Sequence, residues 1–384
     1  MLHEAAGSRT RFPGQRHCAL LNVGACKKIS AMKFAFVYAG GREVRLEAAR
    51  LGNVPADFFY GALEIERAGH TISVYDLNPL PSIPADLLDR CLKGRLPPKT
   101  RVADIVAAGR LLSRLRGSDA IVATSSGCAF ALGFWRRLGR LSGHLVGIHC
   151  GIVNCRHAPS PRWSASWALK AMTPVLFSGN EAAEMSRQFG IERPLSLGFG
   201  VDEGYWFLDD PGRPRSGVLA VGNDGRRDYK TLLSAAALLP DVAFKVVTRL
   251  PLGEDVPRNV ERIHGEWKSD SVSDASLRDL YRAAACVAVP LHESVQPAGQ
   301  SVAMQAMMCG APVVMTRTAG WWGADVLRSG EHILEVPPDH PQALAEAIRS
   351  ALDSRPGRHA RQALVAAGWT ANGFARRIEK VAGG

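Results

Sequence analysis

The sequence predicts an α/β protein of two domains, each built on a parallel sheet. The chain has 384 residues, which is more than one compact core usually holds. An apolar strand at 33–38 is followed by glycines, a helical pattern toward Arg67 and a second strand at 71–75, the order of a βαβ unit. A new strand, turn and helix begin at residue 218, after a segment rich in glycine and aromatic residues.

The predicted domains have limits that follow from this pattern. We expect a first domain at 32–195, a second at 196–365, and a last helix at 366–384 that packs back toward the first domain. Residues 1–31 hold five basic residues around a short apolar patch and show no strand or helix pattern. We interpret them as a disordered basic extension or the product of an upstream start codon. A cleaved signal peptide is the alternative, but the apolar stretch at 18–23 is short.

Composition and charge exclude several classes of protein. Hydrophobic residues make up 46% and charged residues 22% of the chain, as in globular proteins, and no apolar run has membrane-spanning length. The formal net charge of +11 favours anionic partners such as nucleotide diphosphates, acidic lipids or nucleic acid. No RNA-binding aromatic signature, zinc finger or lysine-rich tail accompanies the charge, so we expect no nucleic-acid partner. A basic nucleic-acid binder remains the alternative, marked by salt-sensitive binding.

The eight cysteines show neither a disulfide framework nor paired metal-ligand spacing. A reducing cytoplasm suits them. Cys150, Cys155 and His157 come nearest to a metal-binding motif. Their spacing is loose, however, and the sequence has no second pair of cysteine or histidine residues to complete the site. We therefore expect no bound metal.

The first domain is expected to place small and polar residues at the carboxyl ends of its strands, where ligands of parallel sheets collect. Gly40 and Gly41 follow the first strand, residues 124–127 follow a third, and His149 follows a fourth. The predicted strands are 33–38, 71–75, 120–123, 145–148 and 174–178, with a helix at 181–189.

The second domain repeats this architecture. Its predicted strands are 218–221, 244–248, 286–290 and 313–314; its predicted helices are 229–239, 277–285, 301–309 and 341–352, with a final helix at 371–381.

The stretch from Gly299 to Val314 reads as a polar loop, a helix that ends at glycine, and a buried strand. A helix N-terminus presents unpaired amides and a partial positive charge, which together hold a phosphate. Gly299 lets the backbone approach closely, and Gln300, Ser301 and Val302 supply the first amides. The alternative is a capped helix without a ligand.

This stretch closely resembles the donor-binding segment of GT-B glycosyltransferases of the retaining family 4 type, the glycosyl transferases group 1, and residues 329–338 match their next block. The resemblance spans 32–381 and is strongest in the second domain. It implies a GT-B fold, in which two Rossmann-like domains face each other across a cleft. The first domain would bind the acceptor and the second the nucleotide-sugar donor.

The resemblance also implies roles for individual residues. Gly222, followed by Arg226 and Arg227, matches the glycine and basic residues that clamp the diphosphate, with Arg227 at the usual lysine. His149 falls where the family places a histidine that contacts the donor sugar. A buried structural histidine is the alternative for His149.

Some positions depart from the family pattern. The two glutamates usual in the family are replaced by Pro297 and Gln305, although Gln305 can still hydrogen-bond ribose hydroxyls. Glu293 is a candidate substitute for the first acid, or else an exposed loop carboxylate. Trp321 and Trp322 would stack on the base or cover the donor, or simply fill the domain surface.

The resemblance implies a hexosyltransferase that moves a sugar from a UDP- or GDP-linked donor to an acceptor hydroxyl with retention, without metal or cofactor. His149, Arg227 and Glu293 are its catalytic candidates. The missing acids leave a catalytically degenerate, nucleotide-sugar-binding subunit as the alternative; a sugar phosphorylase or a nucleotide-sugar epimerase would keep the fold with another reaction.

The expected partners are the donor and a glycan or lipid-linked acceptor. Segments 42–60 and 154–167 mix basic and aromatic residues, which suits peripheral contact with an anionic membrane; an ordinary protein surface is the alternative. We therefore expect a cytoplasmic protein at the inner face of the cell membrane, working in cell-surface polysaccharide or glycolipid assembly.

Overall fold

The computed structural model describes residues 31–384 apart from residues 82, 93, 154–158, 266–270, 355–356, 358 and 384. Residues 1–30 of the predicted basic extension, together with Cys155 and His157, lie outside the described residues.

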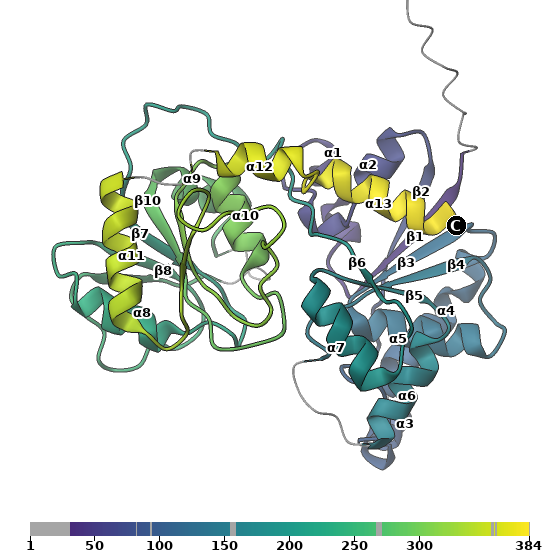
Figure 1. Cartoon of the computed structure of the whole chain (residues 1–384). Helices are drawn as coiled ribbons and strands as arrows, with labels where there is room; N and C mark the ends of the chain where they lie inside the picture. The colour runs from purple at the N-terminus through teal and green to yellow at the C-terminus, as the bar shows by residue number, and fades with distance from the viewer. Residues whose placement is uncertain are drawn as a thin grey trace, which may run out of the picture. The chain divides into compact units, whose positions relative to one another are not determined.

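The first half of the described chain forms a six-stranded sheet in which every pairing is parallel and the order is β2-β1-β3-β4-β5-β6 (Figure 1). Its strands are β1 (Lys33–Tyr38), β2 (Thr71–Asp76), β3 (Ala120–Thr124), β4 (His144–Ile148), β5 (Thr173–Leu176) and β6 (Leu195–Ser196). Its helices are η1 (Glu43–Arg45), α1 (Leu46–Arg50), η2 (Asp57–Phe59), α2 (Ala62–Arg67), α3 (Ile83–Cys91), α4 (Val102–Leu115), α5 (Ser126–Arg137), α6 (Pro159–Leu169) and α7 (Gly179–Phe189).

The second half forms another six-stranded parallel sheet, in the order β12-β11-β10-β7-β8-β9. Its strands are β7 (Ser216–Val221), β8 (Phe244–Val247), β9 (Val260–Ile263), β10 (Ala284–Val289), β11 (Val313–Thr316) and β12 (Leu334–Val336). Its helices are α8 (Tyr229–Ala237), α9 (Asp274–Ala283), α10 (Gln300–Met308) and α11 (Pro341–Ser354), and α12 (Ala360–Ala366) and α13 (Ala371–Gly383) close the chain.

Two parallel sheets with alternating helices confirm the predicted α/β class. The central strands are apolar on both faces: every residue of β3 and of β10 is buried. Alternate residues of one strand enter different cores, as the two-residue period of a strand requires. Val218 packs with α8 and α11, whereas Leu219 of the same strand packs in the core that contains α10. The predicted domain limits stay predictions.

One predicted element is wrong. The helical pattern expected between Gly41 and Arg67 is broken into η1, α1, η2 and α2. Gly52 and Gly61 adopt left-handed backbone angles, with φ of +73° and +85°, and Pro55 lies between them. A continuous helix admits neither left-handed residues nor an internal proline, so the chain turns here. This break carries Asp57 into the interior and leaves Tyr60 half-buried.

The C-terminal helix α13 packs on α2, beside which it runs in Figure 1. Phe374 of α13 lies in an aromatic group with Tyr60 and Phe177, at centroid distances of 6.3 and 6.2 Å. Among the helices that the structure describes, none combines the length and apolar character needed to cross a membrane.

Candidate functional site

Arg227 lies across Gly222, the glycine that directly follows β7. Its Nε donates to the carbonyl of Val221 at 3.0 Å, and its side chain is 4% exposed. Gly222 has φ of +155°, and a Cβ at this position would overlap the Arg227 guanidinium. The glycine therefore makes the room in which the guanidinium lies.

The same guanidinium reaches the start of α10. A Cβ built on Gly299 would lie 3.6 Å from Nη1 of Arg227. Nη1 is 3.2 Å from Oδ2 of Asp224, but it makes no hydrogen bond with any residue that the structure describes. The structure thus brings Gly222 and Arg227, which lie in one turn, together with Gly299, which is far from both in the sequence.

The N-terminus of α10 is open to an acceptor of hydrogen bonds. Gly299 is the N-cap residue, with φ of +72°, and it offers no side-chain cap. The amides of Gln300, Ser301 and Val302 lie in the first turn of the helix, where backbone amides have no intrahelical hydrogen-bond acceptor. Gln300 and Val302 are buried and Ser301 is half-buried. A guanidinium and a helix N-terminus at one place form an anion-binding arrangement.

Gln305, one turn further along α10, is buried and has protein partners. Its Nε2 donates to Oδ2 of Asp57 at 2.6 Å, and its Oε1 accepts from the Tyr281 hydroxyl at 3.4 Å. Both atoms expected to bind ribose are therefore engaged here, and the ribose contact stays a prediction.

Glu293 is exposed and holds two backbone amides. Its Oε1 accepts from the nitrogen of Ala319 at 2.7 Å and of Ser294 at 2.9 Å. These bonds tie the loop after β10 to the loop after β11. Arg226 is half-buried, and its carbonyl accepts from the nitrogen of His292 at 2.9 Å. The catalytic role of Glu293 and the diphosphate contact of Arg226 stay predictions.

The two adjacent tryptophans are buried, with 8% of Trp321 and 6% of Trp322 exposed. Their ring centroids lie 5.3 Å apart, and Trp322 lies 5.6 Å from Trp369. This packing favours the interpretation in which they fill the domain, and stacking on a base stays a prediction.

His149 follows β4 and is fully buried. Its ring lies 5.2 Å from that of Phe130, and neither ring nitrogen has a hydrogen-bond partner among the residues described. Burial lowers the pKa of the imidazole to about 3, and the charge of Lys99 acts in the same direction. His149 is therefore neutral at physiological pH, with two unsatisfied ring nitrogens.

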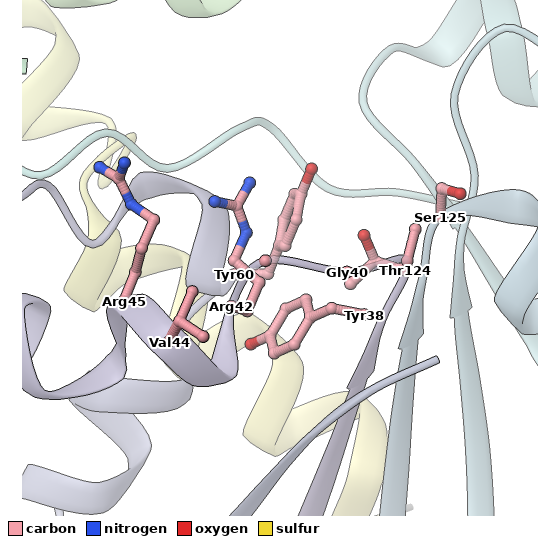
Figure 2. Close-up of a pocket in the computed structure, with 10 residues that line it drawn as sticks. Tyr38, Gly40, Arg42, Val44, Arg45, Tyr60, Thr124 and Ser125 are labelled. Carbon is pink, nitrogen blue, oxygen red and sulfur yellow. The ribbon is translucent and has the colours of Figure 1, made fainter. Parts of the chain in front are cut away.

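Gly40 and Gly41 line a pocket of about 630 Å³ at the carboxyl ends of β1 and β3. Figure 2 shows the side chains of Arg42, Arg45 and Tyr60 pointing to the same side of this pocket. Its lining consists of Tyr38, Ala39, Gly40, Gly41, Arg42, Val44, Arg45, Tyr60, Thr124 and Ser125.

The sequence did not predict Asp57, Arg42 or Tyr60 as site residues. It indicated only that residues 42–60 mix basic and aromatic types. A signal was available in Asp57, a carboxylate directly before Phe58 and Phe59, because an acid in an apolar run is often buried with partners. Those partners lie 145 to 248 residues away and could not be read from the sequence.

One group of possible metal ligands occurs in the part of the chain that the structure describes. Atoms of Asp228, His292 and Asp339 lie within 4.8 Å of one another. His292 and Asp339 are exposed. Exposed acidic groups commonly lie close together without binding an ion. The absence of a metal requirement stays a prediction.

Part of this sequence and the whole fold are similar to those of known proteins. Residues 216–354, the segment from the start of β7 to the end of α11, match the family model described as glycosyl transferases group 1. None of the curated proteins matches the sequence.

Several solved structures share the fold over nearly the whole chain. Sucrose-phosphate synthase from Thermosynechococcus elongatus has a TM-score of 0.64 at 16% identity, covering 91% of this chain and 98% of its own. A glycosyltransferase from Rickettsia africae has a TM-score of 0.62 at 12% identity, covering 92% and 98%. HepE from Anabaena in complex with UDP-glucose has a TM-score of 0.60 at 16% identity, covering 91% and 98%. At these identities the likeness establishes the fold.

The protein therefore has the GT-B fold. Residues 216–354, which hold its second sheet, form a glycosyl transferases group 1 domain, as expected from the sequence.

Proposed function

We propose that this enzyme transfers a hexosyl group from a UDP- or GDP-sugar to an acceptor hydroxyl, with retention of the anomeric configuration and without a metal or cofactor. The observation that carries the proposal is the position of Arg227, which lies over Gly222 and reaches Gly299 at the start of α10. A diphosphate fits this arrangement of guanidinium and helix amides.

These groups would act on the leaving diphosphate. Negative charge grows on the phosphate oxygens as the bond to the sugar breaks. Arg227 and the amides of residues 300–302 are fixed before the reaction, so they stabilise that charge without reorganising. Arg226 adds a second cation near the same turn. Because the site supplies this charge stabilisation itself, a metal ion is not required.

His149 would contact the transferred sugar. Its buried, neutral ring has two unsatisfied nitrogens, one a donor and the other an acceptor, and sugar hydroxyls can satisfy both. A neutral imidazole with a pKa near 3 is a poor base, so an oxygen of the leaving phosphate would take the acceptor's proton. Glu293 would act by holding the loop beside the donor.

The donor and acceptor are proposed from weaker indications. HepE was solved with UDP-glucose, which makes UDP-sugars the first donors to test. A glycan or lipid-linked acceptor at the inner face of the cell membrane would suit the net charge of +11, with polysaccharide or glycolipid assembly as the process.

The test is a panel of UDP, GDP, ADP and their sugar conjugates, measured by thermal shift, because a ligand of the native state raises the melting temperature. A selective shift with one base is the expected result. The panel is followed by incubation with the donor so selected, and nuclear magnetic resonance of the product gives its anomeric configuration. An inverted product would contradict retention, and no shift with any nucleotide would contradict the donor site. Binding without sugar transfer or hydrolysis would favour the degenerate subunit.

A further inference from the structure

Three side chains around the second sheet meet in an arrangement that suits a metal ion. Asp228 is the N-cap residue of α8, His292 follows β10, and Asp339 lies between β12 and α11. One ligand atom of each residue lies within 4.8 Å of those of the other two. The helices α8 and α11 pack against each other. A single ion at this place would therefore join the start of α8, the loop after β10 and the segment before α11.

Asp228 distinguishes this group from acidic residues that merely share a surface. Its side chain is 3% exposed, and its Oδ1 accepts from the backbone nitrogen of Thr231 at 3.0 Å. Its Oδ2 is also buried and makes no hydrogen bond with any residue that the structure describes. A buried carboxylate oxygen without a donor costs free energy, and a cation beside it removes that cost.

The distance from this oxygen to His292 fits two ligands of one ion. Oδ2 of Asp228 lies 3.8 Å from Nδ1 of His292, which is too long for a hydrogen bond. Two ligands of a tetrahedral zinc ion lie about 3.3 to 3.5 Å apart. A small movement of the exposed His292 ring therefore closes the difference, and the exposed side chain of Asp339 is free to turn toward the same ion.

The backbones of the first two ligands are tied to each other. The nitrogen of Asp228 donates to the carbonyl of Pro290 at 3.1 Å, and the nitrogen of His292 donates to the carbonyl of Arg226 at 2.9 Å. These two bonds run in opposite directions between the turn before α8 and the loop after β10. The spacing of Asp228 and His292 is therefore set by the fold.

The charge of the group is not cancelled by a basic side chain. Arg227 is next to Asp228 in the sequence, but its Nη1 lies 3.2 Å from Oδ2 of Asp224 and its Nε donates to the carbonyl of Val221. Among the residues described, neither Asp228 nor Asp339 forms an ion pair with a lysine or an arginine. With a neutral imidazole, the three ligands carry two negative charges, which balance a divalent cation.

We propose that Asp228, His292 and Asp339 bind one Zn²⁺ or a similar divalent transition-metal ion, with water at the remaining position. An imidazole nitrogen suits these ions, whereas Mg²⁺ and Ca²⁺ prefer ligands that are all oxygen. The inference goes beyond the proposed function, and it assigns the ion no part in the sugar transfer. The ion stabilises the folded chain, because unfolding separates its ligands. Its ligands are far apart in the sequence, so no motif announces the site.

The experiment measures Zn²⁺ binding by calorimetry to the full chain without a histidine tag, since a tag binds the same ions. The variants are Asp228→Asn, which keeps a cap oxygen for α8 and removes the charge, and His292→Ala. The matched control is Asp255→Asn, because Asp255 is exposed and lines the same pocket as His292 but lies outside the group of ligands.

The unmodified protein should bind Zn²⁺ at this site and melt at a higher temperature in its presence. Asp228→Asn and His292→Ala should each weaken that binding at least about tenfold, a difference of about 1.4 kcal/mol, whereas Asp255→Asn should change it less than about twofold. Co²⁺ in place of Zn²⁺ gives visible absorption bands, and ligation by a cysteine thiolate would add a band in the near ultraviolet. The visible bands should appear without the thiolate band and should weaken in His292→Ala.

Four results would overturn the inference. The first is that the unmodified protein does not bind Zn²⁺, and the second is that both ligand variants bind it as tightly as the unmodified protein. The third is a Co²⁺ spectrum dominated by the thiolate band, which would assign the ion to cysteines. The fourth is an equal loss of affinity in Asp255→Asn, which would indicate a general attraction of cations to this surface. If Asp228→Asn lowers the melting temperature without metal, His292→Ala decides alone, because that side chain is exposed.

Discussion

Nε2 of Gln305 donates a hydrogen bond to Oδ2 of Asp57 across 2.6 Å in the interior. The Asp57 carboxylate also accepts from Nε1 of Trp206 at 2.7 Å and from the backbone nitrogen of Asp202. Burial raises its pKa to about 7, although these three donors act against the rise. One carboxylate thus joins η2, the segment after β6 and α10.

Replacing Gln305 by Glu should lower the free energy of unfolding at pH 8 by about 2 kcal/mol, because two buried carboxylates would face each other without a donor between them. Chemical denaturation measures the loss. Adding Asp57→Asn places an amide opposite the new carboxylate and should recover part of the loss. The recovery is partial because asparagine has one acceptor oxygen where aspartate has two, so either Trp206 or Asp202 loses its acceptor. No recovery in the double variant would show that the pair does not cause the effect.

Gly222→Ala should weaken nucleoside diphosphate binding at least about tenfold, a loss of about 1.4 kcal/mol. The new Cβ would occupy the place of the Arg227 guanidinium and push it away from Gly299. Gly225→Ala, three residues along in the same turn, meets no atom within 4 Å and is the matched control. Equal affinities of the two variants for UDP would contradict this arrangement.

Arg227→Ala should weaken diphosphate binding by about 2 kcal/mol, the scale of a charge-assisted hydrogen bond. Calorimetry with UDP and GDP measures it. Arg317→Ala removes an exposed arginine paired with Glu335 and should have no effect. Unchanged diphosphate affinity in Arg227→Ala would remove Arg227 from the donor site.

His149→Ala should reduce turnover by about tenfold or more while UDP affinity changes little. The ring would contact the transferred sugar of the donor, and that sugar is absent from UDP. Because the pKa of His149 is about 3, its ring stays neutral between pH 5 and 8 and should add no step to the pH dependence of turnover. Equal loss of turnover and of UDP binding would assign His149 a structural role.

Glu181→Gln should flatten the dependence of stability on pH. Burial raises the pKa of Glu181 from 4.5 to about 7. Between these values the folded state holds more protons than the unfolded state, so stability falls as the pH rises. Between pH 5 and pH 8, the free energy of unfolding of the variant should rise by on the order of 2 kcal/mol relative to that of the unmodified protein. Denaturation at both pH values tests this, and parallel profiles would contradict it.

The sequence predicted the sheets and the start of α10 because these depend on local patterns. The buried run of β10 and the glycine before Gln300 are visible in the residues themselves. The strands β6, β9 and β12 were not predicted, since all three are short and largely half-buried or exposed, so they lack an apolar run.

The sequence could not predict contacts that depend on the folded chain. Gln305 carries the same amide whether it meets ribose or Asp57, and only the break between α1 and α2 brings Asp57 to it. Trp322 packs on Trp369, which lies in a distant part of the chain. The meeting of Arg227 with Gly299 was anticipated only through the family resemblance.

The bond between Asp57 and Gln305 has an evolutionary consequence. A glutamate at position 305 and an aspartate at position 57 exclude each other in the interior, so neither position can change freely while the other stays fixed. Related proteins that carry the glutamate should have lost the acid at the equivalent of Asp57, and the two positions should covary when such sequences are aligned.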